Sequence, residues 1–280
     1  MRVSEGSEFT ELKQLVQSRH LHTVCEEARC PNIYDCWSRR TATFMILGDV
    51  CTRACRFCAV TSGRPTELDL GEPLRVADSV AQLGLKHAVI TSVDRDDLRD
   101  GGAGIFARTI RAIRRRSPGT TIEVLTPDFQ ANLDAVRTVV EAQPDIFNHN
   151  TETVPRLYGS IRPKAVYANS LALLRQVKAL APQMVTKSGL MVGLGETEDE
   201  LVDVFRNMRA HDIDVLTVGQ YLRPSRKHAD VVRYYSPAEF ERLKAQATAM
   251  GFGHVEAGPL VRSSYHADEQ VPDRKNLLAG

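Results

Sequence analysis

The sequence predicts an α/β fold in which parallel strands alternate with helices that cover them. Two observations lead to this prediction. From about residue 43 onward, short runs of β-branched residues alternate with longer segments of helical period, as in repeated βα units. The chain has 280 residues, of which 42% are hydrophobic and 25% charged, which is the composition of an ordinary globular domain with a full core. A closed or partial (β/α) barrel and an open doubly wound sheet both fit this pattern.

Six segments are predicted to form strands. Each is a short run rich in apolar or β-branched residues. The predicted strands are residues 43–49, 87–92, 121–126, 145–150, 185–192 and 214–219, with a possible seventh at 254–257.

The intervals between these strands carry amphipathic helical patterns. Helices are predicted over residues 72–84, 104–116, 132–142, 169–181, 197–210 and 236–250. The face that the first of them should bury consists of Leu74, Ala77, Val80 and Ala81. Thr197 has the side chain and position of an N-cap, with Glu200 three residues later, as in a capping box. Because strand and helix alternate six times, the strands should be parallel with right-handed crossovers.

Three units are expected along the chain. Residues 1–42 do not follow the strand-and-helix rhythm, because a helical stretch at residues 8–18 precedes a Cys-rich segment. We interpret them as an N-terminal extension packed on the barrel. Residues 43–258 should form the barrel, and residues 259–280 an irregular C-terminal tail.

Charge and hydropathy exclude two classes of partner. Thirty-six Lys and Arg residues face 35 Asp and Glu residues, and the net charge of +1 gives no overall field that would hold nucleic acid or an anionic membrane. The longest apolar runs are a few residues, against the roughly 20 that a membrane span requires. The first residues have neither an apolar signal core nor the composition of a transit peptide. We therefore expect a soluble, cytoplasmic protein with no nucleic-acid or membrane partner.

All six cysteines lie between residues 25 and 58, in two triads. The first is Cys25-x4-Cys30-x5-Cys36, and the second is Cys51-x3-Cys55-x2-Cys58. Structural zinc prefers four ligands, often in C-x2-C pairs, and only one pair here has that spacing. Disulfides would be unusual in a reducing compartment, and inert buried thiols would not explain the clustering. Iron-sulfur ligation fits the short spacings of soft thiolates better.

Each triad has one cysteine too few for a 4Fe-4S cluster. Three thiolates bind three of the four irons and leave one corner without a cysteine ligand, where chemistry can occur. A plain electron carrier would use four cysteines per cluster. The two incomplete triads therefore indicate reactive clusters.

The second triad resembles the radical S-adenosylmethionine (SAM) superfamily. Residues 48–60, GDVCTRACRFCAV, contain its CxxxCxxC motif, with Phe57 at the aromatic position before the last cysteine. The resemblance implies a partial (β/α)6 barrel of the radical SAM type. It also implies that Cys51, Cys55 and Cys58 hold a reducing 4Fe-4S cluster, whose fourth iron is chelated by the amino and carboxylate groups of the methionyl part of SAM.

A second superfamily element lies on the fifth predicted strand. The segment from Gly189 to Glu196 is similar to the G-x-I-x-G-x-x-E element, with Met191 in place of Ile and Gly193 as the second glycine. In the superfamily this strand lies against the adenine of SAM. The resemblance thus implies cofactor contacts from Gly189, Met191, Gly193 and Glu196.

Further segments resemble the lipoyl synthase family, and together they span nearly the whole chain. They are residues 21–37, 91–103, 147–154, 219–225 and 261–267, of which the last contains the family's RSSY sequence. The resemblance implies insertion of two sulfur atoms at C6 and C8 of a protein-bound octanoyl chain, after a 5'-deoxyadenosyl radical removes hydrogen. Two alternatives remain at this stage: a radical sulfur-inserting enzyme for a free small molecule, similar to biotin synthase, and a non-enzymatic metal-binding protein.

The same resemblance assigns the first triad to a sacrificial 4Fe-4S cluster that donates the sulfur. Cys25, Cys30 and Cys36 would bind it, and Ser263 would supply the fourth ligand. An oxygen ligand suits iron-sulfur chemistry less well than a thiolate and should leave that iron easier to release. In the alternative interpretation, Ser263 and its neighbour Ser264 hydrogen-bond the tail.

The implied partners are an octanoylated lipoyl carrier protein or domain, such as the H protein or the E2 component of a 2-oxoacid dehydrogenase, and an electron donor such as flavodoxin or ferredoxin. A run of arginines that ends one predicted helix complements the helix dipole, and docking of an acidic carrier is a secondary hypothesis for it. These arginines are Arg111, Arg114, Arg115 and Arg116.

Polar residues at the ends of predicted strands are further candidates, because the active site of a parallel barrel lies at that end. Asn150 and Glu152 follow the fourth strand and should contact the cofactor or substrate. His149 is expected to be packed or hydrogen-bonded, and Arg223 to form a surface salt bridge unless it binds a carboxylate. Four aspartates crowd the loop after the second strand, and the resemblance favours a contact with the methionyl amino group over a solvated loop. They are Asp94, Asp96, Asp97 and Asp100.

Overall fold

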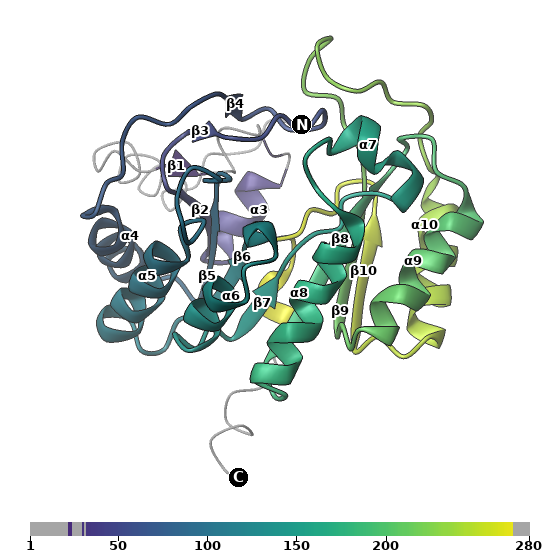
Figure 1. Ribbon diagram of the computed structural model, residues 1–280. Coiled ribbons are helices and arrows are strands. Elements are labelled where there is room, and N and C mark those ends of the chain that lie inside the picture. Colours follow the sequence, from purple (N-terminus) through teal and green to yellow (C-terminus); the bar gives the residue numbers. More distant parts are fainter. Residues whose placement is uncertain (1–21, 24–29, 31, 271–280) are drawn as a thin grey trace.

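The computed structural model describes residues 22–23, 30 and 32–270, and its centre is an eight-stranded sheet (Figure 1). The strand order is β1-β2-β5-β6-β7-β8-β9-β10. Seven of the strands are parallel neighbours, and only β1 pairs antiparallel, with β2. The strand bounds are β1 His22–Thr23, β2 Thr41–Ile46, β5 His87–Ser92, β6 Thr121–Leu125, β7 Ile146–Asn148, β8 Val185–Val192, β9 Val215–Gln220 and β10 His254–Gly258.

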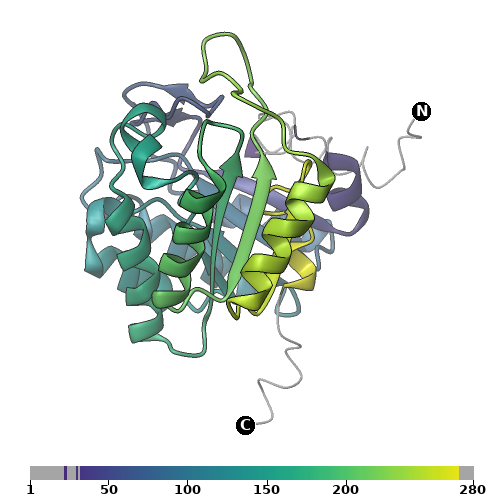
Figure 2. The same cartoon turned by 90° about the vertical axis from the view of Figure 1, so that its right-hand side faces the viewer.

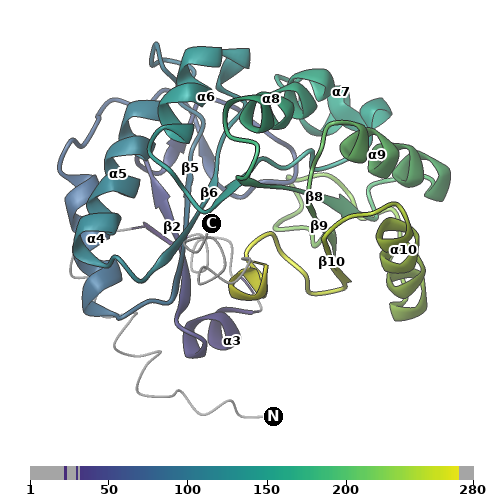
Figure 3. The same cartoon turned by 90° about the horizontal axis from the view of Figure 1, so that it is seen from below.

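Six helices connect the seven parallel strands, one between each pair of neighbours. They are α4 Glu72–Gln82, α5 Ala103–Arg116, α6 Leu133–Val140, α8 Tyr167–Leu180, α9 Glu198–Ala210 and α10 Pro237–Ala249. The helices lie on the outside of the curved sheet (Figures 1, 2 and 3). This is the predicted partial barrel, because six strand-and-helix units are followed by a last strand, β10, whose described pairing is with β9 alone.

The possible seventh strand is thus present, and two predicted strands match the structure at both ends, β5 and β8. Strand β7 is shorter than predicted, since it ends at Asn148 and the chain then turns through Glu152, which has a φ of 66°. Strand β2 begins at Thr41, two residues before the predicted start. The ends of a strand depend on which residues of the neighbouring strands pair with it, and the local sequence pattern does not specify that pairing.

The prediction for the buried face of α4 was wrong in two places. Leu74 is 52% exposed and Ala81 is also exposed, whereas Ala77 and Val80 are buried as predicted. The helix buries Val76 instead, because its apolar stripe is rotated toward α5 and β2. The capping box at the start of α9 is confirmed, since Thr197 and Glu200 cap each other's backbone.

A short helix and the C-terminal tail pack beside each other at the open side of the barrel, between β2 and β10. Figure 3, seen from below, shows α3 (Ile33–Ser38) next to the 3-10 turn η3 (Ala267–Glu269). Asn32 Nδ2 donates to the Leu260 carbonyl at 2.6 Å, and Arg39 pairs with Glu269. The helical stretch predicted at residues 8–18 lies outside the described residues.

No helix in the part of the chain that the structure describes is both long and apolar enough to cross a membrane. The hydrophobic core lies between the outer side of the sheet and the helix faces that cover it, with Phe44, Phe106, Phe147 and Phe205 fully buried.

Candidate active site

The second cysteine triad lies on a loop at the carboxyl ends of the parallel strands, at the top of Figure 1. The loop runs from β3 (Val50–Cys51) to β4 (Thr61–Ser62), which pair with each other. We call residues 51–61 the cluster loop. Its backbone is held from three directions, by Thr52 N to Asp94 O at 3.0 Å, Arg56 N to Ile161 O at 2.9 Å and Ala229 N to Arg56 O at 2.8 Å.

Arg53, inside the cluster loop, is buried and binds three carboxylates. It donates to both Asp96 oxygens at 2.9 Å and to Asp128 at 3.0 and 2.6 Å, and lies 3.3 Å from Asp94. Burial would raise the pKa of Asp96 and Asp128, but the hydrogen bonds from Arg53 lower both below their ordinary values. We call Arg53 and its three aspartates the Arg53 hub. It ties the cluster loop to the loops after β5 and β6.

Part of the predicted aspartate loop is therefore structural. Asp97 binds Arg95 through two hydrogen bonds of 2.8 Å, and Asp100 accepts hydrogen bonds from the backbone of Gly102 and Gly104. Asp94 differs, because burial raises its pKa despite Arg53, and its side chain lies 3.8 Å from the Cys51 sulfur. Among these four aspartates, Asp94 is therefore the one whose side chain is seen in contact with a cysteine sulfur.

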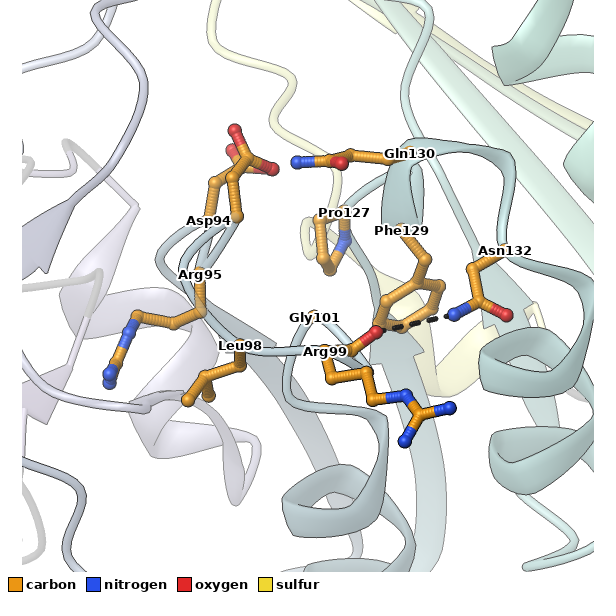
Figure 4. Close-up of a pocket in the computed structure, with 10 residues that line it drawn as sticks. Asp94, Arg95, Leu98, Arg99, Gly101, Pro127, Phe129, Gln130 and Asn132 are labelled. Atoms are coloured by element: carbon orange, nitrogen blue, oxygen red, sulfur yellow. Dashed lines mark hydrogen bonds between the residues drawn. The ribbon is translucent and has the colours of Figure 1, made fainter.

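A hollow of about 120 Å³ lies between the loops that follow β5 and β6 (Figure 4). Gln130, at its upper edge, hydrogen-bonds the Asp96 side chain, and Asn132 donates to the Arg99 carbonyl across it. Its floor includes Phe129. Three successive residues here, 129–131, have left-handed backbone conformations, which hold the loop in a tight turn beside the Arg53 hub.

The three thiols of the cluster loop are partly buried and close enough to influence one another. Burial, with a smaller contribution from neighbouring thiolate charge, raises the pKa of Cys55 to about 11 and that of Cys58 to about 12. The backbone N–H groups of Arg53 and Asp94 donate to the Cys51 sulfur at 3.4 and 3.3 Å. Three desolvated thiolates side by side need a cationic partner, and N–H donors to sulfur favour the thiolate form. The residues therefore fit an iron-sulfur cluster.

In the described residues, no three His, Cys, Asp or Glu side chains converge on a point where one metal ion could sit. A cubane does not require such convergence, because each of its thiolates binds a different iron.

Arg162, a residue that the sequence analysis missed, brings a buried cation to the site. It follows α7 (Tyr158–Ile161), donates to the carbonyls of Asn150 and Thr151 at 3.0 and 3.3 Å, and has its guanidinium 5.4 Å from the Tyr158 ring centre. Burial raises the pKa of both Cys55 and Glu152, and the positive charge of Arg162 offsets part of that rise. Arg162 therefore balances the negative charge of these groups.

Asn150 and Glu152 contact each other, while their predicted contact with cofactor or substrate stays a prediction. Asn150 Nδ2 donates to Glu152 Oε1 at 3.1 Å, and Asn150 Oδ1 is buried without a hydrogen bond. Glu152 also bridges to β8, since its N–H donates to Gly189 O at 3.0 Å and its carbonyl accepts from Met191 N at 2.9 Å. Burial raises the pKa of Glu152.

The end of β8 forms a closely packed turn. A Cβ on Gly189 would lie 2.4 Å from Thr217 Oγ1 and 3.0 Å from Asn150 Oδ1. Gly193 has a φ of 98°, which favours glycine. The Glu196 carboxylate folds back on the turn and accepts from Gly193 N at 2.6 Å and Leu194 N at 2.9 Å. Met191 is half-buried, and it and Phe57 of the cluster loop pack against the same small apolar cluster, which includes Ile161 and Leu194. The predicted cofactor residues thus lie together, with Glu196 shaping the turn.

For the first triad, the structure describes Cys30 and Cys36, while Cys25 lies outside the described residues. Cys36 is buried on α3, and Cys30 precedes that helix. Two residues of the tail segment 262–265 lie within electrostatic range of these thiols, because charge on Cys30 affects the pKa of Arg262 and charge on Cys36 affects that of Tyr265. The half-buried Ser263 lies within that segment. Ser263 thus lies between two tail residues that interact with the first triad, and its role as a ligand stays a prediction.

The remaining candidates have structural contacts. His149 is fully buried, with Nδ1 2.8 Å from the Thr126 carbonyl and Nε2 3.0 Å from Ser170 Oγ, and burial lowers its pKa to about 4. Arg223 pairs with Asp230 at 2.5 Å, and Arg114 with Asp145 at 2.6 Å. These contacts agree with the packed histidine and the surface salt bridge that we expected.

Comparison with known proteins gives one family. The profile of the Radical SAM superfamily matches residues 45–208. The lipoyl synthase of Rubrobacter xylanophilus is 61% identical over 279 residues, which cover 100% of this chain and 87% of the relative. That of Bacillus cereus is 57% identical and covers 100% and 95%, and that of Symbiobacterium thermophilum is 61% identical and covers 94% and 82%.

Two solved structures share the fold at low identity. Methylornithine synthase has a TM-score of 0.57 at 14% identity, over 95% of this chain and 88% of its own. The peptide-bound SuiB of Streptococcus suis has a TM-score of 0.60 at 10% identity, over 89% of this chain and 53% of its own.

Proposed function

The chain belongs to the lipoyl synthase family of radical SAM enzymes, and from this premise we propose how its two groups of cysteines share the reaction. It is a sulfurtransferase that uses SAM and 4Fe-4S clusters. The reaction inserts two sulfur atoms at C6 and C8 of an octanoyl chain on a lipoyl carrier protein. Identities of 57–61% to lipoyl synthases over the whole chain favour this activity over a free small-molecule substrate or a purely metal-binding role.

In our proposal, Cys51, Cys55 and Cys58 bind the cluster that reacts with SAM. Such a cluster supplies the electron that splits SAM into methionine and a 5'-deoxyadenosyl radical. The observation that carries the assignment is the cluster loop itself, with three desolvated thiols, N–H donors to sulfur and the Arg53 hub behind them.

The SAM-binding residues follow from the groups that surround this loop. Asp94 and Glu152 offer carboxylates beside the thiols, and Arg162 offers a cation, which suits the amino and carboxylate groups of a zwitterionic ligand. Met191, two residues after Gly189 on β8, offers an apolar side chain, as an adenine requires, and Met191 and Phe57 pack against the same small apolar cluster. Asn150 has an unpaired buried oxygen that can accept a hydrogen bond from the ligand.

We further propose that Cys25, Cys30, Cys36 and Ser263 bind the cluster that gives up its sulfur. The proximity of the segment 262–265 to Cys30 and Cys36 supports this ligand set. In the described part of the chain no hydrogen bond uses the Ser263 hydroxyl, whereas several bind its neighbours in the tail. Replacing Ser263 by alanine should impair this cluster and sulfur insertion while the SAM-cleaving cluster still forms. Unchanged lipoyl formation by Ser263→Ala would refute the role.

Two partners complete the proposal, which places the protein in the cytoplasm. The octanoyl chain would be carried by an H protein or by the E2 component of a 2-oxoacid dehydrogenase. The electron would come from an acidic donor such as flavodoxin or ferredoxin, docked on exposed cations at or near the cluster loop. These are Arg56, Lys164, Arg226 and Lys227.

This docking surface is testable by charge reversal. The variant Lys227→Glu should slow reduction of the cluster by an acidic donor, and the effect should shrink as salt rises. Arg115→Glu, at the exposed end of α5, is the matched control and should leave the rate unchanged. A slower rate in the control alone would place docking at α5.

The overall activity is tested by anaerobic reconstitution and product analysis. The loaded protein should contain about eight iron atoms per chain and form 5'-deoxyadenosine, with more formed when an octanoyl-lysine peptide is present. The peptide should gain two sulfur atoms. An iron content of about four or less, or radical formation that ignores the peptide, would contradict the proposal.

A further inference from the structure

A charged network crosses the interior of the barrel away from the SAM site. Lys187 on β8 and Glu123 on β6 are both fully buried, and the Lys187 Nζ lies 3.0 Å from Glu123 Oε1. Asn148 Nδ2 donates to the same carboxylate at 2.8 Å, and His87 Nε2 lies 3.6 Å from its other oxygen. The four side chains come from four neighbouring strands, β5 to β8. The network therefore occupies the inside of the barrel.

Lys187 also forms a hydrogen bond with the C-terminal tail. Its ammonium donates to the backbone carbonyl of Ser263, 76 residues further along the chain. An ammonium has three donors, and Glu123 and Ser263 are the acceptors that the described residues provide. A hydrogen bond from a charged donor in a dry interior is stronger than one between neutral groups. Lys187 thus fixes the backbone of the tail at Ser263.

Two other contacts hold the same part of the tail. The Val261 carbonyl lies so close to Gly219 that a Cβ there would come within 2.2 Å of its oxygen. The Leu260 carbonyl accepts from Asn32 at 2.6 Å, just before α3. With Lys187, the tail is pinned between the last strands, the helix that carries Cys36 and the barrel interior.

Barrel stability alone does not account for this arrangement. A buried lysine and glutamate gain little over a well-packed apolar pair, because both charges lose their hydration. An ion pair complete in itself would also need no acceptor on the tail. The bond to Ser263 is what the lysine adds to the fold.

We propose that Lys187 is a positioning residue for the cluster of the first cysteine triad, acting by fixing the Ser263 backbone so that its hydroxyl can reach the cluster iron. The inference rests on the proposed ligand role of Ser263. The part that is new is that a buried lysine on the fifth strand of the barrel controls a ligand supplied by the tail. Its loss should leave the SAM-cleaving cluster unaffected.

The test uses the full chain with Cys51, Cys55 and Cys58 replaced by alanine, so that only the first triad can hold iron. In this background, Lys187→Met should increase the rate at which a chelator removes iron by about tenfold or more, the factor for one lost bond from a charged donor. The cluster's electron paramagnetic resonance spectrum should change toward that of Ser263→Ala. A second variant, Lys187→Met with Glu123→Gln, removes the unpaired carboxylate and should keep the fold while it retains the fast release.

Two controls separate the possible failures. Lys178→Met removes a lysine that donates to two carbonyls and pairs with Asp214 outside the barrel interior, and it should leave iron release unchanged. With Cys25, Cys30 and Cys36 replaced instead, Lys187→Met should not alter the remaining cluster. Normal release and spectrum in both Lys187 variants would overturn the inference alone. A parent protein that binds no cluster at the first triad would overturn the proposed function.

Discussion

Replacing Arg53 by methionine should damage the cluster loop more than any other single change of a charged residue around it. The methionine keeps most of the buried side-chain volume but removes every donor of the Arg53 hub. Asp96 and Asp128 each lose two hydrogen bonds from the guanidinium, and Asp94 loses a cation 3.3 Å away. Three carboxylates are left close together, with Asp128 only 3% exposed.

The expected loss of folding free energy is about 3–5 kcal/mol, the range for removing one partner from a buried ion pair. Arg95 provides the matched comparison in the same loop. It is as buried as Arg53 and also binds a carboxylate twice, but Asp97 is 29% exposed, so water can solvate it after Arg95→Met. We therefore expect Arg95→Met to cost about 1–3 kcal/mol.

The pH dependence of the folding stability is a sharper test, because its sign should reverse when Arg53 is replaced. In the native protein, Asp96 and Asp128 have lowered pKa values, so their stabilisation is present above the unfolded value of about 4 and is lost as pH falls. Without Arg53, burial is left to raise the pKa of these carboxyls. The folded state then binds protons that the unfolded state releases, so stability falls as pH rises. The cost of Arg53→Met should be larger near pH 7 than near pH 5.

Urea unfolding of the iron-free proteins at the two pH values measures this difference, and iron content after reconstitution reports on the loop. The double variant Arg53→Met with Asp128→Asn should recover part of the loss at pH 7, because it removes one of the crowded charges. A cost for Arg53→Met that is below that of Arg95→Met, or that does not grow with pH, would refute the hub as the anchor of the cluster loop.

Three further predictions concern single positions elsewhere in the barrel. Gly189→Ala should destabilise by about 1–3 kcal/mol because its Cβ meets Thr217 at 2.4 Å, whereas Gly119→Ala, with nothing within 4 Å, should not; thermal melts compare them. Thr197→Ala should lower the melting temperature by about 2–4 °C through loss of the α9 cap, worth about 1 kcal/mol, and an undiminished melting temperature would contradict the capping box. His149, with a pKa lowered to about 4, makes stability rise with pH between about 4 and 6.5 by about 3 kcal/mol, so His149→Gln should flatten the iron-free unfolding profile there.

The sequence predicted most of the fold because the periodic elements are local. Strands β5 and β8 contain short runs of apolar and β-branched residues, and the capping box of α9 consists of two residues three positions apart. The order of the strands followed from the alternation of strand and helix. The rotation of α4 about its own axis was not predictable in this way. The helix has two adjacent apolar stripes, and the packing of α5 against it decides which of them is buried.

The cysteines of the site were also predictable, whereas the groups that hold them were not. Arg53 and Asp128 are 75 residues apart in the sequence. The residues around Arg53 form no local pattern that predicts which carboxylate it binds. Arg162 lies after a short helix that the sequence analysis did not identify. For Lys187 a signal did exist: it is a charge inside an otherwise buried strand, and Glu123 is the opposite charge inside another. Charged residues are rarely fully buried unless they are paired, so the sequence could have predicted an ion pair between Lys187 and Glu123.

The two cysteine triads are separated along the chain by little more than one strand. Cys36 lies on α3 before β2, and Cys51 follows β2, so the sites belong to opposite ends of a strand of six residues. Six residues of strand span roughly 20 Å. If the triads have the proposed roles, the radical and the sulfur donor would be held apart by a strand of the central sheet. The Arg53 hub fixes the first end, and the tail pinned by Lys187 and Gly219 fixes the second. Because the described sheet is left open between β1 and β10, beside the tail and α3, the proposed reaction would have the octanoyl chain enter the barrel to meet both sites.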